Sequence, residues 1–132
     1  MAKILVTGAA GFIGSCVADK LAQRGDTVIG LDNFNGYYSI EQKRASEARL
    51  NRHANFRMIE ADIRDRQRML AIYAEEQFDA VAHLAAMAGV RNAVKFPELY
   101  IDVDLNGTQH LMDGARFNHV QNFVFASTSS VW

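Results

Sequence analysis

Three glycines, at positions 8, 11 and 14, have the spacing that brings main-chain amides against a diphosphate. They stand in the run Thr7-Gly8-Ala9-Ala10-Gly11-Phe12-Ile13-Gly14, between a short apolar segment and a helical pattern. Gly8 permits a tight turn, Gly11 leaves no side chain in front of the phosphates, and Gly14 allows close packing of the helix. The first turn of that helix would offer free N–H groups and a favourable dipole to the anion.

The residues after the last glycine argue against a nucleoside triphosphate. A phosphate loop of that kind needs a lysine directly after its last glycine, whereas Ser15 and Cys16 follow Gly14 here. We therefore expect a dinucleotide site and no kinase or NTPase activity. A glycine-rich turn without a ligand is the simpler alternative. Cys16 itself is expected to be a small core residue of the helix.

An acidic residue follows the second apolar run. Asp32 stands 18 positions after Gly14, where a carboxylate can accept hydrogen bonds from both hydroxyls of an adenosine ribose. It would repel the extra phosphate of NADP, and the next residues, 33–35, include no arginine or lysine, so NAD is expected. The alternative is an exposed loop aspartate.

A second acidic residue follows the third apolar run. Asp62 could accept a hydrogen bond from the adenine amino group while Ile63 packs on the ring. An aspartate that only starts the following helix explains the residue equally well.

These residues need a scaffold, and short apolar runs alternate with helical patterns along the chain. The runs predict buried strands at residues 4–6, 27–31, 56–60, 80–84 and 122–126. Helices are expected from Phe12 to about Gly25, from Ser39 to about Asn51, after Asp65, and from Pro97 to Phe117. The alternation predicts an α/β fold, a Rossmann-type doubly wound parallel sheet in the order 3-2-1-4-5.

Such a sheet usually continues to a sixth strand, so we expect one that is truncated after the fifth. Residues 1–132 would then form a single, incomplete NAD-binding domain. On the long helix we expect a core stripe of Ile101, Leu105, Thr108, Met112 and Ala115. A second apolar set (Leu99, Val103 and Leu111) either pairs with another copy of the chain or belongs to the core.

The composition excludes several classes of function. A net charge of −1 points to neither nucleic acid nor an anionic membrane, and no stretch approaches the length of a membrane span. The single cysteine cannot form an intrachain disulfide, which favours a reducing compartment, with the cytoplasm as the default. The histidines lack metal-ligand spacing, so we expect no metal site, and His83 is expected to be a packed strand-end residue.

Five motifs in order make the chain recognisable. The glycine run, Asp32-Asn33, Asp62-Ile63, His83-Leu84-Ala85-Ala86 and the 127–131 segment together resemble the extended short-chain dehydrogenase/reductase superfamily. Within it, the segment 30–38 and Ala88-Gly89-Val90-Arg91 are similar to the UDP-glucuronate 4-epimerase group. The resemblance spans nearly the whole chain.

The resemblance implies roles for individual residues. Thr128 matches the catalytic Ser/Thr, whose hydroxyl would hold the reacting sugar oxygen, and the substrate would contact Ala88, Arg91 and Ser129. The implied cofactor contacts are Gly8, Gly11, Phe12, Ile13, Gly14, Asp32, Asn33, Asn35, Gly36, Asp62, Ile63, Leu84, Ala85, Ala86 and Asp104. A basic cluster (Lys43, Arg44, Arg49, Arg52 and Arg57) is expected to be a charged helix face with its flank.

The chain departs from the family pattern in several places. No Tyr-x-x-x-Lys motif, which carries the family's general base, follows Thr128. Met87 stands where the family usually has a glutamine, and Asp104 where it usually has an asparagine near the nicotinamide ribose. Gly36 replaces a common acidic residue, and Trp132 replaces a tyrosine.

Three hypotheses about function follow. The parent protein would be an NAD-dependent UDP-glucuronate/UDP-galacturonate type 4-epimerase, with a hydride taken from and returned to C4 of the UDP-sugar. A nucleotide-sugar 4,6-dehydratase is the nearest rival, but it needs an acid/base pair beside Thr128, and Ser129-Ser130 offers no carboxylate. The isolated chain would be a non-catalytic NAD-binding module. A homo-oligomer is expected in any of these cases.

Overall fold

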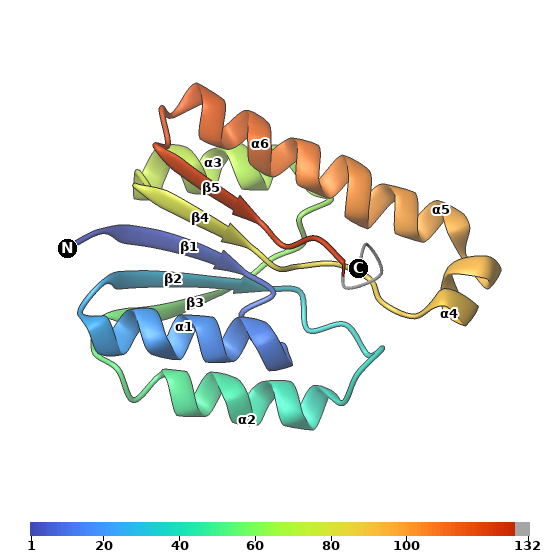
Figure 1. The fold of residues 1–132 in the computed structure, drawn as a ribbon, viewed down its shortest axis with the longest axis horizontal. Coiled ribbons are helices and arrows are strands. Elements are labelled where there is room, and N and C mark those ends of the chain that lie inside the picture. Colours follow the sequence, from blue (N-terminus) through green and yellow to red (C-terminus); the bar gives the residue numbers. More distant parts are fainter. Residues whose placement is uncertain (129–132) are drawn as a thin grey trace.

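A computed structural model describes residues 1–128 as a five-stranded sheet with helices on both faces (Figure 1). The strands are β1 (Lys3–Thr7), β2 (Thr27–Asp32), β3 (Phe56–Glu60), β4 (Ala80–His83) and β5 (Asn122–Phe125). They pair in parallel in the order β3-β2-β1-β4-β5. The predicted strand order is confirmed, and all five carboxyl ends lie at one edge of the sheet.

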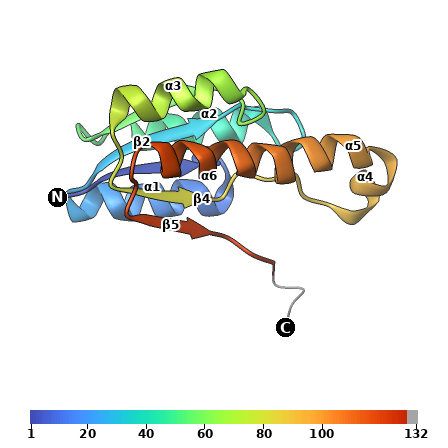
Figure 2. The ribbon, with the colours of Figure 1, turned by 90° about the horizontal axis from the view of Figure 1, so that it is seen from above.

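The helices form one layer on each face of the sheet. The first layer contains α1 (Phe12–Arg24) and α2 (Ile40–Leu50), and the second contains α3 (Arg66–Glu76) and the helical stretch that ends with α6 (Thr108–Phe117) (Figures 1 and 2). Each layer has its own core cluster. Leu50 belongs to the cluster under the first layer, and Tyr73 and Leu111 belong to the one under the second. Burial on both faces accounts for the apolar runs of the central strands.

Side chains cap two helices where the sequence indicated. The Ser39 Oγ accepts a hydrogen bond from the Gln42 amide at the start of α2, and Asp65 accepts one from the Arg68 amide at the start of α3. Each satisfies an amide that would otherwise lack a partner in the first helical turn.

The helix α1 buries small residues and exposes larger ones. Gly14, Ser15, Ala18 and Ala22 face the sheet, whereas Phe12 is 89% exposed and Cys16 is exposed. The expectation that Cys16 is a core residue is therefore wrong. The sheet and the glycine turn approach this helix so closely that only small side chains fit between them.

The long helix expected from Pro97 to Phe117 is continuous in the chain but changes its geometry. It consists of α5 (Pro97–Tyr100), a π-helical segment η1 (Ile101–Gly107) and α6, and a short helix α4 (Val90–Lys95) precedes it. The sequence did not indicate α4 or the π-helical segment. Segments of this kind occur often at functional sites.

The apolar stripes of this long helix are reversed relative to the expectation. Val103, Leu111 and Ala115 are buried, whereas Leu105 is 65% exposed and Met112 is 55% exposed. Of the expected core stripe only Ala115 is buried, and Ile101, Leu105 and Met112 face outward. The buried face also contains Gly107 and Gly114, which let α3 and the preceding loop pack closely.

The helices of residues 1–128 are too short or too polar for a membrane span.

Candidate functional site

A cavity of roughly 620 Å³ opens at the carboxyl ends of the strands, beside the amino end of α1. This is the edge at which doubly wound sheets bind their ligands. The residues predicted to hold cofactor or substrate that line it are Gly8, Gly11, Phe12, Ile13, Gly14, Asp32, Asn33, Asn35, Asp62, Ile63, Leu84, Ala85, Ala86 and Ala88. The structure therefore brings the glycine turn after β1 and residues at the ends of β2, β3 and β4 into one cleft.

Four of the expected site residues do not line this cleft. They are Gly36, Arg91, Asp104 and Thr128. Arg91 is exposed on α4, and Thr128 is exposed three residues beyond the end of β5. Ser129 lies outside the described residues. A group of side chains able to hold a metal ion is not found among residues 1–128.

The glycine turn forms a cradle that side chains would fill. Gly8 has a φ of +71°, a conformation that favours glycine, and a Cβ on it would lie 3.0 Å from the Ala85 amide nitrogen. A Cβ on Gly14 would overlap the Gly8 carbonyl oxygen. The first turn of α1 begins after Gly11 without a side-chain cap, so its amides face the cleft. The residues present thus fit a diphosphate.

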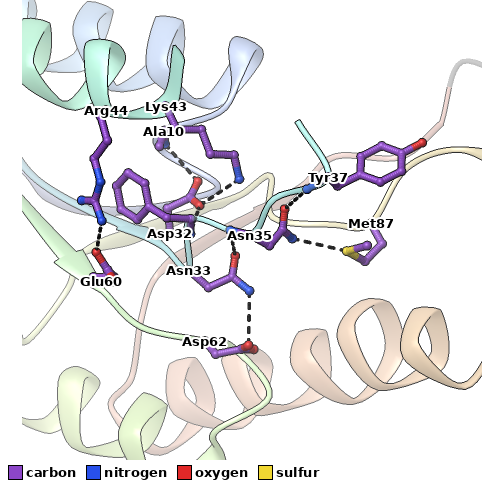
Figure 3. A network of polar contacts seen from close by, with 11 residues as sticks. Ala10, Asp32, Asn33, Asn35, Tyr37, Lys43, Arg44, Glu60, Asp62 and Met87 are labelled. Atoms are coloured by element: carbon purple, nitrogen blue, oxygen red, sulfur yellow. Dashed lines mark hydrogen bonds and ion pairs between the residues drawn. The ribbon is translucent and has the colours of Figure 1, made fainter. Parts of the chain in front are cut away.

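Asp32 lies beside this cradle at the end of β2 and is 6% exposed (Figure 3). One carboxylate oxygen accepts the Phe34 amide at 2.8 Å, and the other accepts the Ala10 amide at 3.1 Å. The first oxygen also contacts the Lys43 ammonium at 3.3 Å. A carboxylate has about four acceptor positions, so the oxygen bonded to the Ala10 amide can still accept a hydrogen bond from a hydroxyl group.

Lys43 is the site residue that the sequence interpretation missed. It was assigned to a charged helix face, but it is 7% exposed and lines the cleft through its contact with Asp32. The assignment is therefore wrong for this member of the cluster. One signal was available, because Lys43 lies four residues after the Ser39 cap and so belongs to the helical turn nearest the cleft. Arg49 also reaches the cleft, where it donates to the Ser15 hydroxyl at 3.2 Å.

Asp62 lines the cleft directly after β3. Its carboxylate accepts hydrogen bonds from the Arg64 side chain. It also accepts one from the Asn33 side chain at 3.2 Å, which Figure 3 shows. Burial raises the pKa of Asp62, but the hydrogen bonds from Arg64 and Asn33 outweigh it and hold this pKa below its ordinary value. The carboxylate is thus kept ionised, and it joins the loops after β2 and β3.

The loop after β2 also reaches the loop after β4. The Asn35 side chain donates to the Met87 sulfur at 3.4 Å, and its oxygen accepts the Tyr37 amide at 3.3 Å (Figure 3). Tyr37 lies against Gly89, where a Cβ would overlap the phenol oxygen. Residues 33–37 therefore connect the side of the cleft after β2 with the side after β4.

A chain of buried hydrogen bonds through Thr7 and His83 supports the floor of the cleft. The Thr7 hydroxyl accepts the amides of Leu84 and Ala85 at 3.0 and 3.1 Å and lies 2.6 Å from His83 Nδ1. Because Thr7 already accepts two hydrogen bonds, its own proton goes to Nδ1, and His83 Nε2–H donates to Thr108 at 2.8 Å. Burial lowers the pKa of His83 to about 4, so the ring is neutral at physiological pH.

The comparisons with known proteins agree with this geometry. A family model described as GDP-mannose 4,6-dehydratase matches residues 5–132. UDP-glucuronate 4-epimerase 4 of Arabidopsis thaliana is 44% identical over 130 residues, which are 98% of this chain and 30% of that protein. Protein CapI of Staphylococcus aureus is 38% identical over the same share of this chain and 39% of its own.

Solved structures are similar over nearly all of the chain. The UDP-glucuronic acid 4-epimerase of Bacillus cereus, in complex with UDP-glucuronic acid and NAD, has a TM-score of 0.86 and 34% identity. The match covers 98% of this chain and 41% of that one. The UDP-Glc/GlcNAc 4-epimerase of Campylobacter jejuni has a TM-score of 0.89 and 28% identity, over 98% of this chain and 38% of its own. This chain therefore spans well under half the length of its relatives.

Proposed function

The chain belongs to the family described by the GDP-mannose 4,6-dehydratase model, and from that membership we propose that residues 1–132 are the NAD-binding domain of a nucleotide-sugar 4-epimerase. The observation that carries the proposal is the cradle at Gly8 and Gly14 with the Asp32 carboxylate beside it. The cradle suits a diphosphate, and the carboxylate suits the ribose hydroxyls of a dinucleotide that lacks a 2′-phosphate.

The residues of this chain would bind and orient the two halves of the cofactor. Gly11, Phe12, Ile13 and Gly14 would surround the diphosphate, and Asp62 and Ile63 would lie at the adenine end. Leu84, Ala85 and Ala86 would form the floor under the second ribose, together with Asn33 and Asn35 from the crossing loop. Bound NAD would supply the acceptor and donor of the hydride at the sugar C4.

The substrate side of the site is the finer part of the proposal. We propose a UDP-sugar of the UDP-glucuronate/UDP-galacturonate type, because relatives at 41–44% identity are named UDP-glucuronate 4-epimerases. Thr128 would hold the reacting oxygen, and Ala88, Arg91 and Ser129 would contact the sugar nucleotide. Arg91 and Thr128 are both exposed, on α4 and after β5. Gly36 would contribute a backbone contact in the crossing loop.

A nucleotide-sugar 4,6-dehydratase is the second candidate, since the family model carries that description. The epimerase is favoured by the names of the relatives and by the absence of a carboxylate in Ser129-Ser130. For the 132-residue chain alone, we propose binding of NAD without turnover, because the chain contains no Tyr-x-x-x-Lys motif after Thr128.

We also propose that the protein forms a homo-oligomer in the cytoplasm. The outward stripe of Ile101, Leu105 and Met112 supports self-association, because each of these side chains is more than half exposed along one long helix. Replacement of Leu105 by Asp should shift the sedimentation coefficient from that of a dimer to that of a monomer. A wild-type chain that sediments as a monomer at every concentration would remove this part of the proposal.

Calorimetric titration with NAD+ and NADP+ tests the cofactor. We expect saturable binding of NAD+ and at least tenfold weaker binding of NADP+. Gly14→Ala should abolish NAD+ binding because its Cβ would overlap the Gly8 carbonyl, whereas Gln23→Ala, on the exposed far turn of the same helix, should bind as the wild type does. A folded wild-type chain that binds neither dinucleotide would refute the proposal.

A further inference from the structure

Asp104 is an implied cofactor contact that does not line the cleft itself. It lies in the π-helical segment η1, is half-buried, and accepts the Met87 amide on Oδ1 at 2.9 Å. Within residues 1–128 that amide is its hydrogen-bond partner, and a basic side chain does not pair with it. Burial raises the pKa of Asp104 above its ordinary value and the Met87 amide offsets part of this effect, so the ionised carboxylate has no cationic partner in the described part of the chain that compensates its charge.

The position of Asp104 relative to the cleft is set by Met87. Met87 lines the cleft in the loop after β4, and Asp104 holds the backbone of this residue from the helix side. The two acidic residues at the proposed adenosine end lie on the opposite side of β1, where Asp32 ends β2 and Asp62 follows β3. A dinucleotide that crosses the sheet between β1 and β4 therefore has its second base on the Met87 side.

The two redox states of the cofactor differ in charge at that base. The oxidised nicotinamide ring carries one positive charge, and the reduced ring is neutral. A nearby ionised carboxylate attracts the oxidised ring and has no net charge interaction with the reduced ring. Partial burial strengthens the attraction to the oxidised ring relative to bulk water. An amide at the same position would accept the Met87 amide equally well but would carry no net charge.

We propose that Asp104 sets the redox preference of the cofactor site, by favouring oxidised NAD+ over NADH through its negative charge. This inference rests on the proposed NAD binding and deepens it. An asparagine at position 104 could accept the same Met87 amide without carrying a charge. The geometry of the backbone contact to Met87 is the same for either residue, so the charge is the difference.

Paired titrations with NAD+ and NADH measure this preference as the ratio of the two dissociation constants. Asp104→Asn keeps an acceptor for the Met87 amide and removes the charge, and we expect the ratio Kd(NADH)/Kd(NAD+) to fall by roughly three- to tenfold. Asp104→Ser removes the charge with a different side-chain shape and should lower the ratio in the same direction. Asp102→Asn, two residues earlier in the same segment and bonded to Asn106, is the matched control and should leave the ratio unchanged.

The outcomes separate this inference from the function on which it rests. If both dinucleotides bind and the two Asp104 variants keep the wild-type ratio, the inference is wrong and the NAD site stands. If Asp102→Asn lowers the ratio as much as Asp104→Asn, the effect comes from the general field of the helix, and the assignment to Asp104 is wrong. If the folded wild-type chain binds neither dinucleotide, both proposals fail. Far-ultraviolet circular dichroism of each variant verifies that the fold is retained.

Discussion

Acidification should destabilise the fold through His83. The ring is 1% exposed and lies between Thr7 and Thr108, so a second proton on Nδ1 would meet the Thr7 hydroxyl hydrogen in place of a lone pair. Burial lowers the pKa of His83 from 6.5 to about 4. A histidine whose native pKa is lowered stabilises the fold above its unfolded pKa, and this contribution is lost as the pH falls through that value.

The magnitude follows from the two pKa values. With 6.5 in the unfolded chain and about 4 in the folded one, the free energy of unfolding falls by about 2 kcal/mol between about pH 7.5 and pH 5. The loss reaches about 3 kcal/mol near pH 4. A loss of this size is a large part of the marginal stability of a small domain.

Urea denaturation at pH 7.5 and pH 5 measures the effect, and His83→Asn isolates it. The asparagine keeps an acceptor near Thr7 but cannot take up a proton. The drop in the free energy of unfolding between pH 7.5 and pH 5 should therefore be about 2 kcal/mol smaller in the variant than in the wild type. His119→Asn, at an exposed position with φ of 56°, is the control and should keep the wild-type pH dependence. If His83→Asn and the wild type lose equal stability on acidification, protonation of His83 does not cause the loss.

Two further predictions concern packing and charge. Lys43→Met should lower the free energy of unfolding by about 2 kcal/mol, because it leaves the buried Asp32 carboxylate without its ionic partner, and Lys20→Met on the exposed side of α1 should have little effect in the same urea titration. Gly114→Ala should cost about 2 kcal/mol, because its Cβ would overlap the Tyr73 ring, whereas Gly36→Ala meets only the tip of Ile40 at 3.8 Å. A neutral Gly114→Ala would show that α3 and α6 can move apart without cost.

The order of the sheet could be predicted from the sequence because local pattern determines it. Short apolar runs alternate with helical patterns, and right-handed crossovers leave few possible arrangements. The glycine cradle could be predicted for the same reason, since its three glycines and its strand–turn–helix setting are adjacent in the chain.

The buried faces of two helices could not be predicted. The prediction assigned the large apolar residues to the core, whereas in the structure the small residues face the sheet and the neighbouring helix. On α1 the buried residues are Gly14, Ser15, Ala18 and Ala22, and on the long helix Gly107 lies against Ile63, whose Cδ1 would be 2.5 Å from a Cβ on it. Small residues allow the helix axis to approach its neighbour, and the large apolar residues then point away. Glycine inside a helical pattern was the available sign of such a contact.

The burial of Lys43 required tertiary information. A lysine among arginines on a helix of mostly polar residues is typical of a solvated face. It becomes buried because α2 begins beside the loop after β2, where the Asp32 carboxylate needs a counter-charge. The conformation of that loop could not be predicted from the spacing or the composition of the helix.

The proposed cofactor site and the proposed catalytic hydroxyl lie in different parts of the sheet. Thr7 binds the amides of Leu84 and Ala85, and Gly8 lies so close to Ala85 that a Cβ would not fit without movement. These contacts join the glycine turn after β1 to the floor of the cleft after β4. Thr128 follows β5, outside this unit, and is exposed. The part of the cleft that suits a dinucleotide is thus formed by residues before β5, whereas the proposed catalytic hydroxyl follows that strand.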